Sequence, residues 1–174
     1  LDLLDRVEQL LEWTKEMIMP NSVCIAFLFN PMSFLTAIMQ NTARTNGFAL
    51  DNMTLQTDVV HMREPEEVLA PAENGAYIHG LFLEGADWEV GSQGQQDYLI
   101  EQKPKILHPK MPIINVISVE MKDKKNRGQY TCPVYVTSMR GPTFVFSANL
   151  QMESDDFDAK KWVMAGVCLL MSED

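Results

Sequence analysis

Residues 74–88 constrain the fold of this chain more than any other part of its sequence. Their apolar and β-favouring side chains fall on both faces of an extended segment, which is typical of a strand buried on two sides. Gly75, Gly80 and Gly85 stand within the stretch, and a glycine in a strand usually marks a bend, a bulge or a close backbone approach. We therefore predict a central strand in a sheet that curves.

Composition excludes several classes of protein. The chain has 174 residues, of which 46% are hydrophobic, so it is long enough for one substantial core. Its formal net charge of −10 is the opposite of the basic footprint that nucleic acids and anionic membranes require. Cys24, Cys132 and Cys168 form no CxxC pair and indicate a reducing compartment. We expect no nucleic-acid partner, no membrane partner and no thiolate metal site.

A stripe of apolar residues at three- and four-residue spacing predicts the first helix. Its members are Leu3, Leu4, Val7, Leu10, Leu11, Thr14, Met17 and Ile18. Pro20 closes the pattern, because proline cannot continue a helix. The sequence opens on Leu1 inside this pattern, so we expect a fragment of a longer protein. The stripe must be covered by the rest of the domain or by a neighbour.

The second helix is predicted from its start and stop signals. Asn30 is a good capping residue, Pro31 suits the first helical position, and Gly47 is a typical stop. These helices define a helical subregion at 1–48. From 49 to 174, alternating patterns and turns predict an α+β fold, in which an antiparallel sheet curls into an incomplete six-stranded β-barrel. The strands are placed at 52–59, 74–88, 112–120, 129–137, 143–150 and 161–170, with a short addition at 98–100.

Candidate catalytic chemistry is sparse. His79 lies in the middle of a strand, where a lone histidine is usually packed and hydrogen-bonded. The enzymatic alternative is a hydrolase that pairs His79 with Glu84 or Asp87. His61 and His108 lack the ligand spacing of a zinc site. The sequence therefore predicts no catalytic residue, no cofactor and no metal.

Two charged clusters remain. The acidic run 153–158 lacks the glycine and the distal glutamate of a calcium loop, so we predict a solvated loop. Lys122, Lys124, Lys125 and Arg127 fall on a hairpin tip. This basic cluster is interpreted as a soluble turn, and contact with an acidic protein surface is the alternative.

Several blocks of the sequence resemble dynein heavy chains. Residues 29–37, Phe-Asn-Pro-Met-Ser-Phe-Leu-Thr-Ala, with Gln40, are similar to that family's F-N-P-x-S-F-L-T-A helix. The stretch that begins at Gly75 resembles its G-A-Y-x-H-G-L-F-x-E-G-A-x-W signature, carried here by Gly75, Tyr77, His79, Gly80, Gly85 and Trp88. Further blocks follow in order at 111–112, 130–135, 140–143 and 162–167. Cys24 and Phe27 depart from the family, which usually has tryptophan and glycine there.

The resemblance is to the carboxy-terminal domain of the motor, and the motifs look closer to axonemal than to cytoplasmic dyneins. It implies helices followed by an incomplete barrel that lies across the AAA+ ring and has no nucleotide site. Such a domain is thought to tune movement, force or processivity in the cytoskeleton of a cilium or flagellum, and it meets the microtubule only through the parent motor. Ring contacts are expected at Leu3, Val7, Leu10, Asn30, Phe34 and Gln40.

A binding module is the alternative to this regulatory interpretation. A curved sheet with an open mouth can hold a small ligand or a peptide. A stand-alone barrel of that kind predicts a sizeable, pre-formed cavity, whereas an interior filled by side chains would remove its basis.

Overall fold

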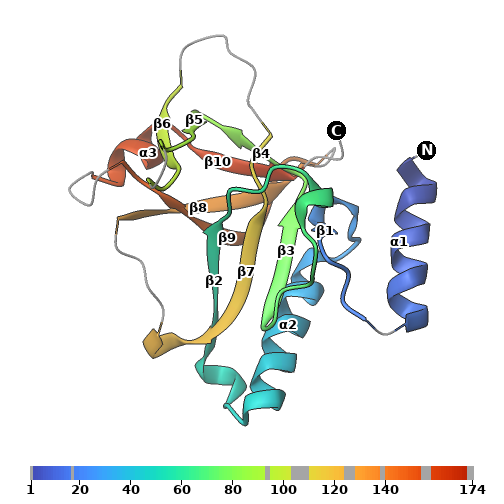
Figure 1. The fold of residues 1–174 in the computed structure, drawn as a ribbon. Coiled ribbons are helices and arrows are strands. Elements are labelled where there is room, and N and C mark those ends of the chain that lie inside the picture. The colour runs from blue at the N-terminus through green and yellow to red at the C-terminus, as the bar shows by residue number, and fades with distance from the viewer. Residues whose placement is uncertain are drawn as a thin grey trace.

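The computed structural model describes residues 2–16, 18–92, 95–102, 110–123, 128–137, 140–153 and 158–171. It shows a mixed α+β domain that consists mostly of sheet (Figure 1), so the predicted α+β class is confirmed. The hydrogen-bonded strands form two four-stranded sheets and one two-stranded sheet, and the described strands form no closed barrel.

Two helices come early in the sequence, α1 (Asp2–Glu16) and α2 (Pro31–Asn46). Helix α2 begins as its sequence indicates, because the side-chain oxygen of Asn30 accepts the backbone N–H of Ser33 at 3.0 Å. It ends at Gly47, whose N–H donates to the carbonyl of Ala43. Helix α1 ends at Glu16, before the predicted limit at Pro20.

The first sheet has the order β1-β3-β7-β2. Its strands are β1 (Val23–Cys24), β3 (Gly75–His79), β7 (Ile114–Glu120) and β2 (Met53–Val59). Helix α2 packs against this sheet (Figure 1) and buries an apolar face that includes Phe34, Leu35 and Ile38. The connections carry the short 3-10 helices Ile25–Phe27, Leu50–Asn52, Pro65–Glu67 and Met121–Asp123.

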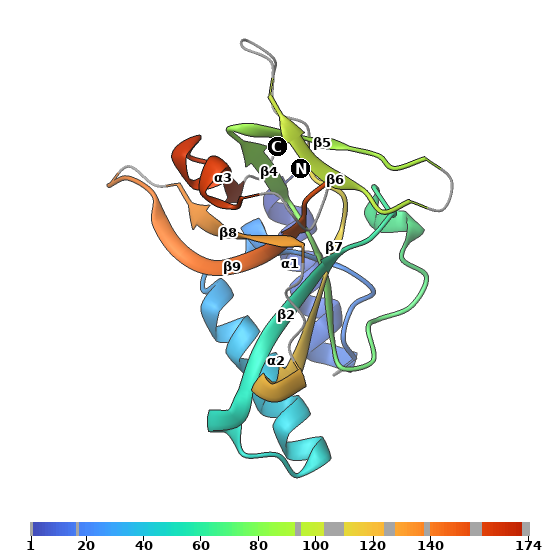
Figure 2. The same cartoon turned by 90° about the vertical axis from the view of Figure 1, so that its left-hand side faces the viewer.

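The second sheet has the order β4-β10-β8-β9, and β5 pairs with β6 in the third. The strands are β4 (Leu81–Glu84), β10 (Cys168–Met171), β8 (Gln129–Val136), β9 (Thr143–Gln151), β5 (Ala86–Glu89) and β6 (Tyr98–Glu101). A short helix, α3 (Lys160–Met164), precedes β10. Strand β2 of the first sheet meets β9 of the second (Figure 2), which brings the two sheets together at one corner.

The stretch 74–88 does not form one strand. It supplies β3, β4 and β5 in turn, one to each of the three sheets. The breaks fall at Gly80 (φ 83°) and Gly85 (φ 82°), where the backbone adopts the left-handed conformation that glycine tolerates best. The prediction that these glycines mark bends is confirmed, and the prediction of a single central strand is wrong because a left-handed residue ends an extended segment.

Two further predictions need correction. The sheets are not wholly antiparallel, because β1 runs parallel to β3 and β10 runs parallel to β8. The strand predicted at 161–170 is instead helix α3, a turn and the shorter strand β10. The apolar run was misleading because only Trp162 of this helix is buried, whereas Val163 and Met164 point into solvent.

Candidate functional site

The signature glycines act through packing. A Cβ atom on Gly75 would overlap the carbonyl oxygen of Val116 in the neighbouring strand β7. At Gly85 it would lie 3.1 Å from the carbonyl oxygen of Ala165, in the turn between α3 and β10. Both positions therefore need the absence of a side chain so that two backbone segments can approach. Trp88 is buried in the core and Tyr77 is half-buried on β3.

His79 lies on β3 opposite Cys24 of β1, partly buried. Burial is the main cause that lowers the pKa of His79 to about 4, and the nearby positive charge of Lys110 adds to it. The imidazole is therefore neutral at pH 7. A packed neutral histidine fits a structural role.

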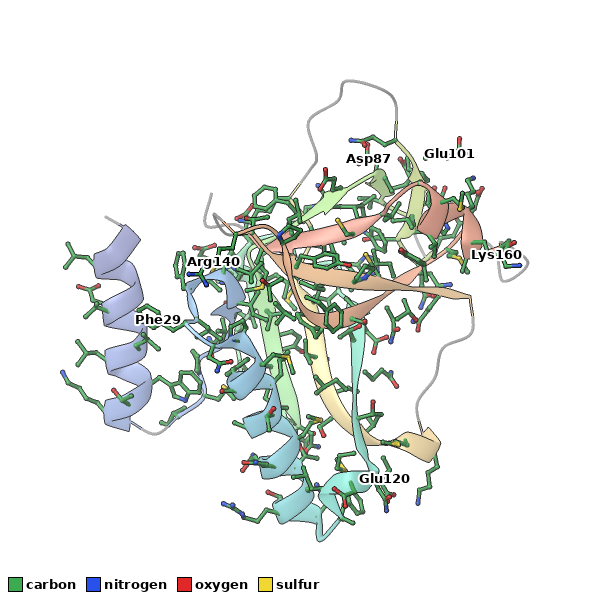
Figure 3. All side chains as sticks on the ribbon, turned by 180° about the vertical axis from the view of Figure 1, so that it is seen from behind. Phe29, Asp87, Glu101, Glu120, Arg140 and Lys160 are labelled. Carbon is green, nitrogen blue, oxygen red and sulfur yellow. The ribbon has the colours of Figure 1, made fainter. Side chains whose placement is uncertain are left out.

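Glu84 and Asp87, the two acids proposed as catalytic partners of His79, make hydrogen bonds to other groups. Glu84 accepts a hydrogen bond from the thiol of Cys168 at 3.8 Å, and Asp87 accepts the backbone N–H of Trp88 at 2.8 Å. No catalytic arrangement is evident among the residues that the structure describes. Figure 3 shows Asp87 near Glu101, at the corner formed by β5 and β6.

The other candidates for metal binding or thiol chemistry are His61, His108 and Cys132. The Nδ1 atom of His61 lies 3.3 Å from a carboxylate oxygen of Asp97, while His108 is outside the described residues. Within the described ranges no group of three or more His, Cys, Asp or Glu side chains could hold a metal. Burial raises the pKa of the Cys132 thiol well above its usual range, which makes it unreactive.

Both charged clusters are only partly described. Lys122 pairs with Glu120 at 2.7 Å, whereas Lys124, Lys125 and Arg127 lie outside the described residues. In the acidic run, 154–157 lie outside them as well. The carboxylate of Asp158 accepts the backbone N–H of Lys160 at 2.9 Å, so this acid helps to start α3.

Side chains fill the space between the sheets. Leu81, Leu83, Val134, Leu150 and Leu169 are all almost completely buried in one apolar cluster. Four grooves in the described part of the molecule are open to solvent, with volumes between about 250 and 440 Å³. A filled interior removes the basis for a barrel that encloses a ligand.

Helix α1 carries apolar side chains that are exposed to solvent. Helix α1 stands to one side of the domain (Figures 1 and 3), and the Trp13 ring meets the Phe34 ring edge-on with centroids 5.6 Å apart. On α1, Leu4, Val7 and Leu11 are between 43% and 64% exposed. They stand at i, i+3 and i+7, which places them on one face of the helix. Sequence reasoning chose Val7 but passed over its two neighbours.

The predicted contact residues fall into different environments. Val7 and Gln40 are exposed, and Leu10 is half-buried. Asn30 is exposed while its side-chain oxygen caps α2, and Phe34 is buried against Trp13. Nothing is described of the Leu3 side chain. The structure therefore brings Trp13 and Phe34 together, while leaving Val7 and Gln40 apart from them on the surface.

The fold and its exposed apolar helix define an α+β domain with a surface suited to contact with another protein segment. Residues 1–171 match the family model for the C-terminal domain of the dynein heavy chain. The protein described here belongs to this family, and the identification suggested by the motifs is confirmed.

The curated relatives carry axonemal, ciliary and flagellar names. The chain is 45% identical over 170 residues to "Dynein axonemal heavy chain 9" of Homo sapiens, and 44% identical to a ciliary dynein beta chain of Tripneustes gratilla. It is 42% identical over 172 residues to the dynein beta chain of the flagellar outer arm of Chlamydomonas reinhardtii. Each match spans 98% of the present sequence and 4% of the relative. Among the described helices, none has the length and apolar character needed to cross a lipid bilayer.

Proposed function

We propose that this domain is the non-catalytic C-terminal module of an axonemal dynein heavy chain. It packs on the AAA+ ring of that motor and tunes the movement, force or processivity of the motor on microtubules. The domain itself touches the microtubule only through its parent motor. Its place of action is the axoneme of a cilium or flagellum, which accords with the names of its relatives.

The exposed stripe of Leu4, Val7 and Leu11 is the observation that carries this proposal. At about 100° per residue, Trp13 lies about 180° around α1 from Leu4. The helix thus has two apolar sides, and the Trp13 side already contacts the domain through Phe34. A helix with two apolar sides buries both only when it lies between two bodies.

The relatives are far longer than the present sequence, and their additional residues provide the second body. The present sequence corresponds to 4% of each relative, and the family name places the domain at the carboxy terminus. The preceding part of such a heavy chain is therefore present at high effective concentration next to α1. An apolar surface of this kind costs solubility when it is left exposed, so an intramolecular cover is favoured.

In this proposal the two subregions have separate tasks. The helical subregion at 1–48 provides the contact with the ring, through Val7 and its neighbours on α1 and through Gln40 on α2. Phe34 holds α1 to the domain from the inside, since its ring meets Trp13. The subregion at 49–174, which carries strands β2 to β10 instead of the six predicted, acts as a body whose attachment or release alters the ring.

The proposal is tested in a full-length axonemal heavy chain that includes this domain. Leu4→Ser and Leu11→Ser together remove two of the three apolar side chains of the stripe. They should therefore weaken docking and change the microtubule gliding velocity or the stall force. Leu69, which is 88% exposed on another part of the surface, provides the matched control Leu69→Ser. Unchanged velocity and force in the stripe variant, with normal expression, would contradict a regulatory ring contact through α1.

A further inference from the structure

A second surface lies at the corner where α3 meets β6. We propose that this corner binds an extended protein segment in which a lysine or arginine stands beside apolar residues. The partner is a different one from the ring, and the proposal stands independently of the α1 contact. Figure 3 places the labelled Glu101 and Lys160 on one side of the molecule and Phe29 on the opposite side.

The corner contains an open cavity of about 280 Å³. Strand β6, the segment after β9 and helix α3 supply its lining, which consists of Leu99, Ile100, Glu101, Glu153, Lys161 and Trp162. The core side is apolar, because Leu99 and Trp162 are buried in the main hydrophobic cluster. The rim carries the charged groups. A cavity with an apolar floor and a few polar groups at its rim is suited to one inserted side chain.

The charges at the rim favour a cation. Lys161 Nζ lies 2.6 Å from a carboxylate oxygen of Glu101 and 5.0 Å from the centroid of the Trp162 ring. This ion pair lowers the pKa of the Glu101 carboxyl through its hydrogen bond with Lys161, and the two opposite charges largely neutralise each other. Glu153 supplies the remaining negative charge of the lining. A lysine or arginine that enters the cavity therefore finds a carboxylate of opposite sign.

Trp162 supplies an unused hydrogen-bond donor. Its side chain is 3% exposed, and its indole Nε1 has no acceptor among the described atoms. A buried donor without a partner costs free energy, and pairing it on binding recovers that cost. An extended segment presents backbone carbonyl groups at regular spacing, so it brings the acceptor that a free lysine or arginine side chain lacks.

Exposed apolar residues come directly after the lining residue Trp162 in the sequence. Val163 and Met164 follow Trp162 on α3, and Met164 is 86% exposed. Exposed apolar residues next to a charged cavity are typical of a surface that another protein covers, and methionine adapts well to different partners. Nucleic acid is disfavoured as the occupant because the protein has a formal net charge of −10.

The test uses the 174-residue protein and a synthetic peptide, acetyl-Leu-Lys-Val-Arg-Leu-amide, as probe. Its matched control is the same peptide with glutamate in place of lysine and arginine. NMR spectra of the ¹⁵N-labelled protein follow the indole N–H signal of Trp162 during titration. We expect saturable binding of the basic peptide with a shift of the Trp162 signal, and no saturable binding of the acidic peptide.

Variants locate the site. Glu153→Gln should weaken binding by about threefold, the size of a partly exposed ion pair. Met164→Ser should weaken it by about tenfold through lost apolar contact. Asp51→Asn and Leu69→Ser are the controls, since both remove an exposed group of the same kind elsewhere. The absence of binding, or equal losses in the test and control variants, would overturn the proposal, as would an unmoved Trp162 signal.

Discussion

The side-chain oxygen of Thr57 accepts the backbone N–H of Asn149 at 2.6 Å, in a fully buried position. Thr57 belongs to β2 and Asn149 to β9, so this hydrogen bond joins the first sheet to the second. It satisfies a backbone donor of β9 that would otherwise be buried without a partner. One hydroxyl group thus links β2 to β9 at the corner of the domain where these strands meet (Figure 2).

Replacing Thr57 with valine should destabilise the domain by about 1–3 kcal/mol, because the isosteric side chain leaves the Asn149 N–H unsatisfied. Urea unfolding followed by circular dichroism measures the change. Thr57→Ser keeps the hydroxyl and serves as the control, with a smaller loss from one missing methyl group. Equal losses in the two variants would show that the hydrogen bond contributes nothing beyond packing.

Trp13→Ala should release α1 from the domain without unfolding the rest. The edge-on contact with Phe34 is worth about 0.5–1.5 kcal/mol beyond burial, and α1 has its other apolar side in solvent. Hydrogen exchange should therefore speed up in α1 while β7 and β8 stay protected. Trp13→Phe retains an aromatic ring and should show a weaker effect. Loss of protection across both sheets would instead show that the stability of the sheets depends on the packing of α1.

Stability should fall between pH 6.5 and pH 4 because of His79. Its pKa is lowered from 6.5 to about 4 in the folded state, chiefly by burial, so in this window the unfolded state binds a proton that the folded state does not. The contribution of His79 to the free energy of unfolding is fully present above pH 6.5 and is lost as the pH drops toward 4. Its size is about 1–3 kcal/mol after allowance for partial exposure.

Chemical unfolding between pH 5 and pH 7 checks this contribution. His79→Gln should flatten the pH dependence, because it removes the group that titrates differently in the two states. An unchanged slope in the His79 variant would mean that the imidazole titrates alike in the folded and unfolded states.

Gly85→Ala should cost more than Gly166→Ala. Both glycines have left-handed backbones, with φ near 82° and 70°, so both substitutions carry a strain of about 1 kcal/mol. The added Cβ finds open space at Gly166, but at Gly85 it would lie 3.1 Å from the carbonyl oxygen of Ala165. The difference between the losses of unfolding free energy in the two variants measures the cost of crowding where Gly85, after β4, approaches the turn before β10. Similar costs would contradict it.

Local signals allowed much of the fold to be predicted. Asn30 and Pro31 place the start of α2, the alternation at 53–59 places β2, and the glycines mark the bends after β3 and β4. These features depend on residues close together in the sequence. The parallel pairing of β1 with β3 depends on distant segments, and a two-residue strand carries no periodicity to reveal it.

The candidate sites were less predictable for the same reason. The stripe on α1 was visible as a pattern, but its spacing could not show that Trp13 faces the domain while Leu4 faces solvent. The run at 161–170 was apolar and suggested a strand, which concealed Met164 as an exposed residue at the end of a short helix. Exposure is a property of the assembled fold, so composition alone is a poor guide to it.

The sequence by itself determined the family and the bends of this domain, because motifs and left-handed glycines are properties of short segments. Only the tertiary structure decided that residues 75–89 serve three sheets, that Thr57 joins two of them, and that His79 is held neutral. Each of these depends on which distant segments meet. Burial, hydrogen bonding and charge act through space, and their partners are separated by up to 92 positions in the sequence.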